Sequence, residues 1–199
     1  MTASPPAARL TAQFDFLNEA DRLKSVLRAT TLCDGSRREN SGEHSWHIAL
    51  YAMILSEHAH RPVNIDRVIR MLLLHDLVEI DAGDAPVHGD HDPIEQARIE
   101  RIAADRIFGL LPADQGAGLR ALWDEFEAAE TDDAIFAKSV DRVQPVMANL
   151  QSGGGTRSTE YNVTPEKLET RVGIKVRRGA PALWSALKGR IDAWFAANG

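Results

Sequence analysis

The chain has 199 residues, of which 44% are hydrophobic and 26% charged, so its composition is that of a folded globular protein rather than a disordered one. It carries 23 basic and 29 acidic residues, and the formal charge of −6 argues against a general binder of nucleic acids or anionic membranes. A single cysteine, Cys33, excludes an internal disulfide framework and cysteine-rich zinc sites. The unusual feature is the seven histidines, several of which stand beside carboxylates.

The first nine residues lack the basic and apolar segments of a signal peptide, so we expect a flexible tail over 1–9. No stretch approaches the roughly 18 apolar residues that a membrane span requires. We therefore expect a cytoplasmic protein with no membrane association.

Apolar residues recur every three or four positions along almost the whole chain, which predicts helices. The first helix is expected over 10–27, followed by a polar loop over 34–40. Asn40 or Ser41 then caps a second helix, with Glu43 or His44 at its third position. The inward face of this helix carries His47, Ile48, Tyr51, Ala52 and Leu55.

Asn64 caps a third helix, and Asp76 and Glu79 continue its apolar face. Residues 81–93 are rich in glycine, proline and aspartate and predict a long loop. Further helices are expected over 94–110, from near 119, from Thr131 or Asp132 to 150, and over 184–195. Pro145 is expected to kink or shorten the helix that contains it. Residues 153–155, all glycine, form a break, and 172–176 is a doubtful strand.

This pattern predicts an all-α fold, with one helical domain over 10–152 and a C-terminal extension over 153–199. The terminal amphipathic helix is expected to pack on that domain or on a partner subunit. A homodimer is therefore left open.

Polar groups interrupt several apolar helix faces. His47 lies on such a face, His75 and Asp76 interrupt the most hydrophobic helix, and Asp141 lies among small residues. Each alone is more often structural, but burying unpaired carboxylates costs several kcal/mol, so the set favours a compensating cation. Two imidazoles and two carboxylates suit Mn, Fe, Co, Ni or Zn.

Three sequence blocks occur in order: Glu-His-Ser-Trp-His over 43–47, His-Asp-Leu-Val-Glu over 75–79, and Gly-Asp over 83–84. Together with Asp141, they resemble the HD-domain metal-dependent phosphohydrolase superfamily, in the branch that holds the 5′-deoxynucleotidases. The resemblance covers roughly residues 15–150. It implies one divalent metal ion (Mn, Co, Fe, Ni, Zn or Mg). The implied ligands are His47, His75, Asp76 and Asp141.

The resemblance also implies that Glu79 is the acid/base residue, that Asp84 grips the sugar, and that Arg28 lies near the phosphate. A carboxylate one turn beyond His75 can handle the proton of an activated water. Arg28 can instead be a cation at a helix C-terminus, and Asp84 a plain loop carboxylate.

Other polar residues are candidates for substrate or metal contacts. His44 is expected to orient a ligand or to contact phosphate, and Arg37 and Arg38 suit an anionic ligand, although they can also pair with acidic neighbours. His88 and His91 can supply a second metal site, but a mobile acidic loop is the better reading of that segment.

The sequence therefore predicts a metal-dependent phosphohydrolase acting on a small-molecule phosphoester, most simply a nucleoside or deoxynucleoside 5′-monophosphate. One alternative is another HD-type reaction, on a cyclic nucleotide, a nucleoside triphosphate or a different phosphoester. An alternative of another class is a non-catalytic helical module that binds metal or nucleotide.

Overall fold

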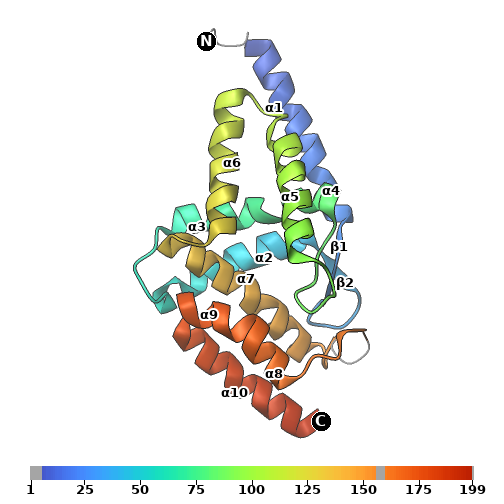
Figure 1. Cartoon of the computed structure of the whole chain (residues 1–199), viewed down its shortest axis with the longest axis vertical. Coiled ribbons are helices and arrows are strands. Elements are labelled where there is room, and N and C mark those ends of the chain that lie inside the picture. Colours follow the sequence, from blue (N-terminus) through green and yellow to red (C-terminus); the bar gives the residue numbers. More distant parts are fainter. Residues whose placement is uncertain (1–5, 156–159, 199) are drawn as a thin grey trace.

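The computed structural model describes residues 6–155 and 160–198. These residues form helices joined by connecting segments. Among them, a two-stranded sheet, which follows the first helix in the chain, is the one departure from the all-α fold that the sequence predicts (Figure 1). The prediction of an all-α protein is confirmed. The longer helices are α1 (Pro6–Asp21), α2 (Ser41–Leu55), α3 (Ile65–Leu74), α5 (Pro93–Phe108), α6 (Ala113–Ala128), α7 (Asp132–Gln151) and α10 (Pro181–Asn198).

The amino-terminal helix is shorter than the sequence predicts. Helix α1 ends at Asp21, and a 3₁₀ turn (Arg22–Ser25) leads into strand β1 (Leu27–Thr31). That strand pairs antiparallel with β2 (Arg38–Asn40), so part of the predicted first helix and of the predicted loop forms a hairpin. Residues 6–9, expected in the tail, begin α1, and the rest of the predicted tail lies outside the described residues.

Three predicted helix caps are confirmed. The side chain of Asn40 accepts a hydrogen bond from the backbone N–H of Glu43, and the Glu43 side chain accepts one from the backbone of Asn40, which forms a capping box at the start of α2. The side chain of Asn64 accepts a hydrogen bond from the backbone N–H of Arg67 at the start of α3, and that of Thr131 accepts one from Ala134 at the start of α7. These local hydrogen bonds fix where the site-bearing helices begin.

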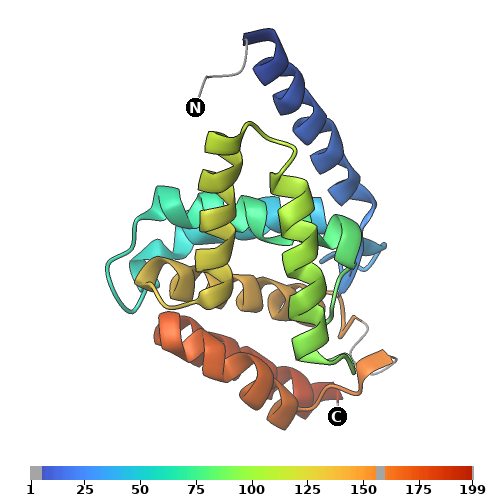
Figure 2. The same ribbon diagram turned by 45° about the horizontal axis from the view of Figure 1, so that its top comes forward.

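Helix α3 does not continue through Glu79. It tightens into a 3₁₀ turn (His75–Val78), which is followed by the short helix α4 (Glu79–Ala82). The chain then passes through the predicted loop to α5, which lies beside α6 (Figures 1 and 2). Helix α6 starts at Ala113, earlier than expected, because Gly116 lets it approach the carbonyl of Phe108 closely.

Helix α7 continues through Pro145 to Gln151, so the proline does not end it. Its packing against neighbouring helices on several sides outweighs the backbone hydrogen bond that proline cannot donate. The helix packs most extensively against α9 (Ile174–Gly179), which follows α8 (Pro165–Leu168) and a π-helical turn (Glu169–Gly173). The doubtful strand over 172–176 is therefore helical.

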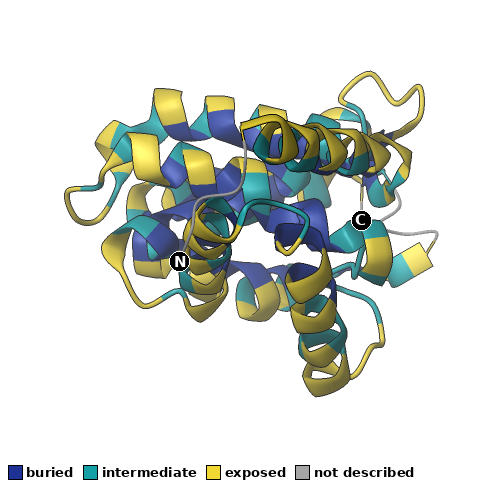
Figure 3. Ribbon diagram, turned by 90° about the horizontal axis from the view of Figure 1, so that it is seen from above, coloured by how far each residue is buried: buried dark blue, intermediate teal, exposed yellow. Residues whose placement is uncertain are grey.

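Helices α9 and α10 form the layer below α7 in Figure 2. Val143 and Val146 of α7 pack with Trp184, Leu187 and Ile191 of α10, so the terminal helix covers its own chain. Buried positions gather at the centre of the molecule, whereas α1 is mostly exposed (Figure 3). Within the two described ranges, no helix combines the length and the hydropathy needed to cross a membrane.

Candidate metal centre and active site

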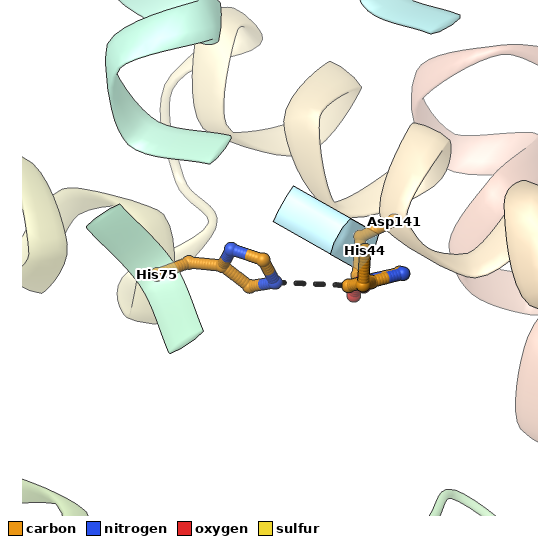
Figure 4. A group of neighbouring side chains, drawn as sticks. All are labelled: His44, His75 and Asp141. Atoms are coloured by element: carbon orange, nitrogen blue, oxygen red, sulfur yellow. Dashed lines mark hydrogen bonds and ion pairs between the residues drawn. The ribbon is translucent and has the colours of Figure 1, made fainter. Parts of the chain in front are cut away.

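Three elements bring two imidazoles and a carboxylate to one buried point. Helix α2 supplies His44, the turn after α3 supplies His75, and α7 supplies Asp141. Figure 4 shows His75 pointing towards Asp141 and His44 from the other side. The Nε2 atom of His44 lies 3.1 Å from Oδ1 of Asp141, and that of His75 lies 3.7 Å from the same oxygen. One potential ligand atom from each residue lies within 4.8 Å of the other two.

The hydrogen bonds at the Nδ1 atoms of His44 and His75 leave the two Nε2 atoms suited to binding a cation. Nδ1 of His75 donates to the carbonyl oxygen of Leu72 at 2.8 Å, and Nδ1 of His44 donates to Oε1 of Gln144 at 2.9 Å. With the hydrogens on Nδ1, the lone pairs on both Nε2 atoms face carboxylate oxygens. Nε2 of His75 is buried without a hydrogen-bond partner. Lone pairs facing a carboxylate repel it unless a proton or a metal ion lies between them.

The pKa shifts of His75 and Asp76 also fit a site for a cation. Burial lowers the pKa of His75, but the charges of Asp76 and Asp141 outweigh it and raise that pKa to about 10. Burial alone would raise the pKa of Asp76, yet the nearby His75 and Arg28 lower it. Both groups thus favour their charged forms, and the carboxylates attract positive charge to this point.

Asp76 flanks the cluster. Its Oδ1 lies 2.8 Å from Nε2 of His75, and its Oδ2 accepts a hydrogen bond from Arg28 at 2.8 Å. One carboxylate therefore joins the imidazole of His75 to the neighbouring arginine. This position allows Asp76 to serve as a fourth ligand.

The structure does not bring His47 into this cluster. His47 lies three residues beyond His44 and is half-buried, and its Nδ1 is 3.3 Å from the amide nitrogen of Gln144. Its ring packs edge-on against Tyr51, and burial lowers its pKa. His44 thus occupies the position that the sequence interpretation gave to His47. The physical reason is the helix register: the buried face of α2 runs through Ser41, His44, Ser45, Ile48, Ala49 and Ala52.

Arg28 lies among four carboxylates. Besides Asp76, its guanidinium is 3.4 Å from Glu79, 3.5 Å from Asp84 and 3.7 Å from Glu39. Its side chain is only 12% exposed. A cation held by so many acids is well placed to set the geometry and charge of those acids.

Glu79 combines burial with close acidic neighbours. Its Oε2 accepts a hydrogen bond from the hydroxyl of Ser41 at 2.5 Å. Burial, and then the charge of Asp76, raise the pKa of Glu79 well above its usual range. A carboxyl group that binds a proton this readily suits general acid/base work near neutral pH.

The remaining predicted substrate residues divide into two groups. Asp84 accepts a hydrogen bond from the backbone N–H of Ala29 at 3.3 Å and lines the same cavity as Glu79. Arg37 pairs with Glu43 at 2.6 Å, and Arg38 pairs with Glu160. Both arginines are exposed and neither lines this cavity.

His88 and His91 also line the cavity, but among the described residues neither belongs to a group of side chains that could hold a metal ion. Burial and the charge of Arg171 lower the pKa of His88 to about 4, and its Nδ1 is buried without a hydrogen-bond partner. Throughout the part of the chain that the structure describes, the His44, His75 and Asp141 group is the one such cluster. The geometry therefore favours one metal site.

One cavity of about 380 Å³ opens onto the cluster. Its lining combines the metal-site residues His75, Asp76 and Asp141 with Glu79 and Asp84. Residues of the C-terminal segment, among them Tyr161 and Lys175, line the same cavity. A small phosphorylated molecule could therefore meet the cation and the acid/base group together.

The model of the HD domain matches residues 20–184. The chain belongs to the HD-domain family of metal-dependent phosphohydrolases. This confirms the resemblance found in the sequence, and the match extends past residue 150 into the segment that carries α9.

Curated relatives of this HD-domain chain include the human 5′-deoxynucleotidase HDDC2, 31% identical over 133 residues, which are 66% of this chain and 64% of the human protein. The 5′-deoxynucleotidase yfbR of Photorhabdus temperata is 29% identical over 77% of this chain and 81% of its own. The match to the human relative thus spans slightly less than two thirds of that protein.

Solved structures share the fold. A crystal structure of a predicted metal-dependent phosphohydrolase from Magnetospirillum magnetotacticum has a TM-score of 0.87 and 46% identity, and the match covers 95% of this chain and 96% of that one. A conserved hypothetical protein from Pyrococcus furiosus, 18% identical with a TM-score of 0.62 over 88% and 99% of the two chains, shows the fold alone.

Two residues of the site escaped the sequence interpretation as cluster members. His44 was expected to orient a ligand or to contact phosphate, although Ser41, Ser45 and Ala49 mark its face as one that small residues leave open to close packing. Gln144 had no assigned role, yet it bonds to His44 and donates to Glu39 at 3.2 Å. No sequence signal marked Gln144, because its contacts with His44 and His47 join positions about 100 residues apart.

Proposed function

We propose that this HD-domain enzyme hydrolyses nucleoside 5′-monophosphates, deoxynucleotides among them, to a nucleoside and phosphate. The observation that carries the proposal is the position of Glu79. Its carboxyl lies in the same cavity as the His44, His75 and Asp141 group, with a raised pKa, within reach of Arg28 and beside Asp84. The names of the curated relatives support the choice of substrate.

The residues that would hold the metal ion are His44, His75 and Asp141, with Asp76 beside them. A divalent cation bound there would act as a Lewis acid towards water and phosphoryl oxygens. Nitrogen and oxygen ligands together suit Mn, Fe, Co, Ni or Zn. We propose one of these metals as the bound ion.

Hydrolysis joins a water oxygen to phosphorus and breaks the bond between phosphorus and the sugar oxygen. Glu79 accepts the proton of that water and returns a proton to the leaving oxygen. The hydroxyl of Ser41 and the guanidinium of Arg28 hold the Glu79 carboxyl in place. Asp84 accepts a hydrogen bond from a hydroxyl group of the sugar. We propose the cytoplasm as the location of the reaction.

A phosphate-release screen tests this function. Purified protein, loaded in turn with Mn, Co, Zn and Mg, is offered deoxy- and ribonucleoside monophosphates, cyclic nucleotides and nucleoside triphosphates. We expect turnover of monophosphates, which Glu79→Gln abolishes while the bound metal is retained. Arg37→Gln is a matched control, because it changes an exposed residue outside the cavity. Release from cyclic nucleotides or triphosphates alone would contradict the proposed substrate.

A further inference from the structure

The phosphate of such a substrate needs a positive partner besides the metal, and Arg28 is poorly available for it. Arg28 is nearly buried, and four carboxylate groups lie within 3.7 Å of its guanidinium. A phosphate dianion approaching it would meet those carboxylates first. The charge of Arg28 is therefore already balanced within the protein.

Two other cations line the same cavity with far less acidic company. Arg142 follows Asp141 on α7, and its one ion pair among the described residues is with Asp141, at 3.5 Å. The Nε atom of Arg142 is buried without a hydrogen-bond partner among the described residues. A buried N–H donor left unpaired beside a metal site is a costly arrangement that an incoming oxygen ligand would relieve.

Lys175 approaches this arginine from the C-terminal segment. Its helix, α9, lies against α7, where the hydroxyl of Ser139 donates to the carbonyl oxygen of Lys175 at 3.3 Å. The charge of Arg142 is the first cause that lowers the pKa of Lys175, followed by burial and by Lys138. For Lys175, burial and the repulsion from Arg142 and Lys138 therefore outweigh the attraction of the nearby acids Asp141 and Glu127.

Lys138 belongs to the same face of α7 but is already paired. Its ammonium donates to Glu127 at 2.9 Å and sits 4.3 Å from the ring centroid of Phe126. Arg142 and Lys175 are thus the two cavity-lining cations whose charge is least compensated. Collecting like charges at one wall of a cavity is a cost that a bound anion offsets.

We propose that Arg142 and Lys175 form an anion subsite that holds the phosphate of the substrate, and the free phosphate product, beside the metal cluster. The subsite rests on the proposed function for its substrate, a phosphomonoester dianion. It places one phosphate-binding residue on α7, next to a metal ligand, and the other on α9. The α9 segment therefore contributes to substrate binding as well as to the core.

Inorganic phosphate is the direct probe. We would titrate it calorimetrically into metal-loaded wild type, Arg142→Gln, Lys175→Gln and Arg142→Lys. A charge-assisted hydrogen bond lost in each glutamine variant should weaken phosphate binding by about 10-fold or more, and lysine at 142 should restore part of it. Arg178→Gln is the matched control, since it removes the same charge from α9 at an exposed residue that does not line the cavity.

Steady-state kinetics separate binding from a general loss of structure. We expect both glutamine variants to raise KM for a nucleoside monophosphate, with the bound metal unchanged and with inhibition by the phosphate-free nucleoside unchanged. Because the side chain of Lys175 is only partly buried, its variant should fold even where the Arg142 variant does not.

Unchanged phosphate affinity in Lys175→Gln and in a folded Arg142→Gln, or an equal loss in Arg178→Gln, would overturn the subsite. A wild-type enzyme that releases no phosphate from any monophosphate would instead overturn the proposed function. The calorimetric titration would still decide the subsite in that case.

Discussion

Replacing His44 by asparagine should remove most of the metal affinity, whereas the same change at His47 should not. His44 presents Nε2 to Asp141 at 3.1 Å, while His47 contacts the metal cluster only through Gln144. Changing a residue that merely orients a ligand lowers metal affinity by about 10–100-fold. We therefore expect a loss of at least about 100-fold for His44→Asn and of no more than about 10-fold for His47→Asn.

The difference in metal affinity between the two variants can be measured as a difference in metal-dependent stability. A metal present at 100 times its Kd stabilises the folded protein by about 2.7 kcal/mol, and a 100-fold weaker site leaves about 0.4 kcal/mol. The lost 2.3 kcal/mol corresponds to roughly 5–9 °C in Tm for a chain of this size. Each variant is melted with metal and with a chelator, so that only the metal-dependent shift is compared.

The comparison with chelator also removes any cost that the substitution has for the metal-free fold. Metal content of the purified variants gives a second, independent reading. If His47→Asn abolished the metal-dependent rise in Tm and His44→Asn kept it, the assignment of His44 to the cluster would be wrong.

Two further predictions concern packing and charge in the same framework. A side chain at Gly179 would meet Ser139 and the carbonyl oxygen of Ile135, the latter at 2.6 Å, so Gly179→Ala should lower the free energy of unfolding by about 1–3 kcal/mol in chemical denaturation. A side chain at Gly189 on α10 would meet no atom within 4 Å, so Gly189→Ala should raise the free energy of unfolding by about 0.4–1 kcal/mol. Burial raises the pKa of Glu100, so its ionisation destabilises the fold as the pH rises through that pKa. Glu100→Gln should therefore raise Tm at pH 7 and lose that gain towards pH 4, and a gain that grows on acidification would contradict this sign.

The features that the sequence predicts well are those decided locally. The caps at Asn40, Asn64 and Thr131 depend on side chains that bond to the backbone three residues further on, and each forms as expected. The family likewise follows from short blocks of sequence. Glu79 and Asp84 line the same cavity as His75, which precedes them in the chain by four and nine residues.

The errors arise where contacts distant in sequence decide the outcome. The hairpin over 27–40 depends on strand pairing and on contacts between Arg28 and carboxylates some 50 residues away. The helix that periodicity predicts through residue 27 is therefore wrong at its C-terminal end. The choice between His44 and His47 depends on which face of α2 meets α7. Gln144, 100 residues from His44, settles that register. No local pattern carries this information.

The charges around the cavity explain why the C-terminal segment belongs to the site. Five carboxylates lie around the guanidinium of Arg28 and the two imidazoles; they belong to Glu39, Asp76, Glu79, Asp84 and Asp141. Even with Glu79 protonated, a divalent cation leaves this group with no positive charge to spare for a phosphate dianion. The missing charge must come from other side chains, and the cavity offers it at Arg142 of α7 and Lys175 of α9. Removing the charge of Lys175 in the full chain should therefore lower phosphate affinity while the metal ligands persist.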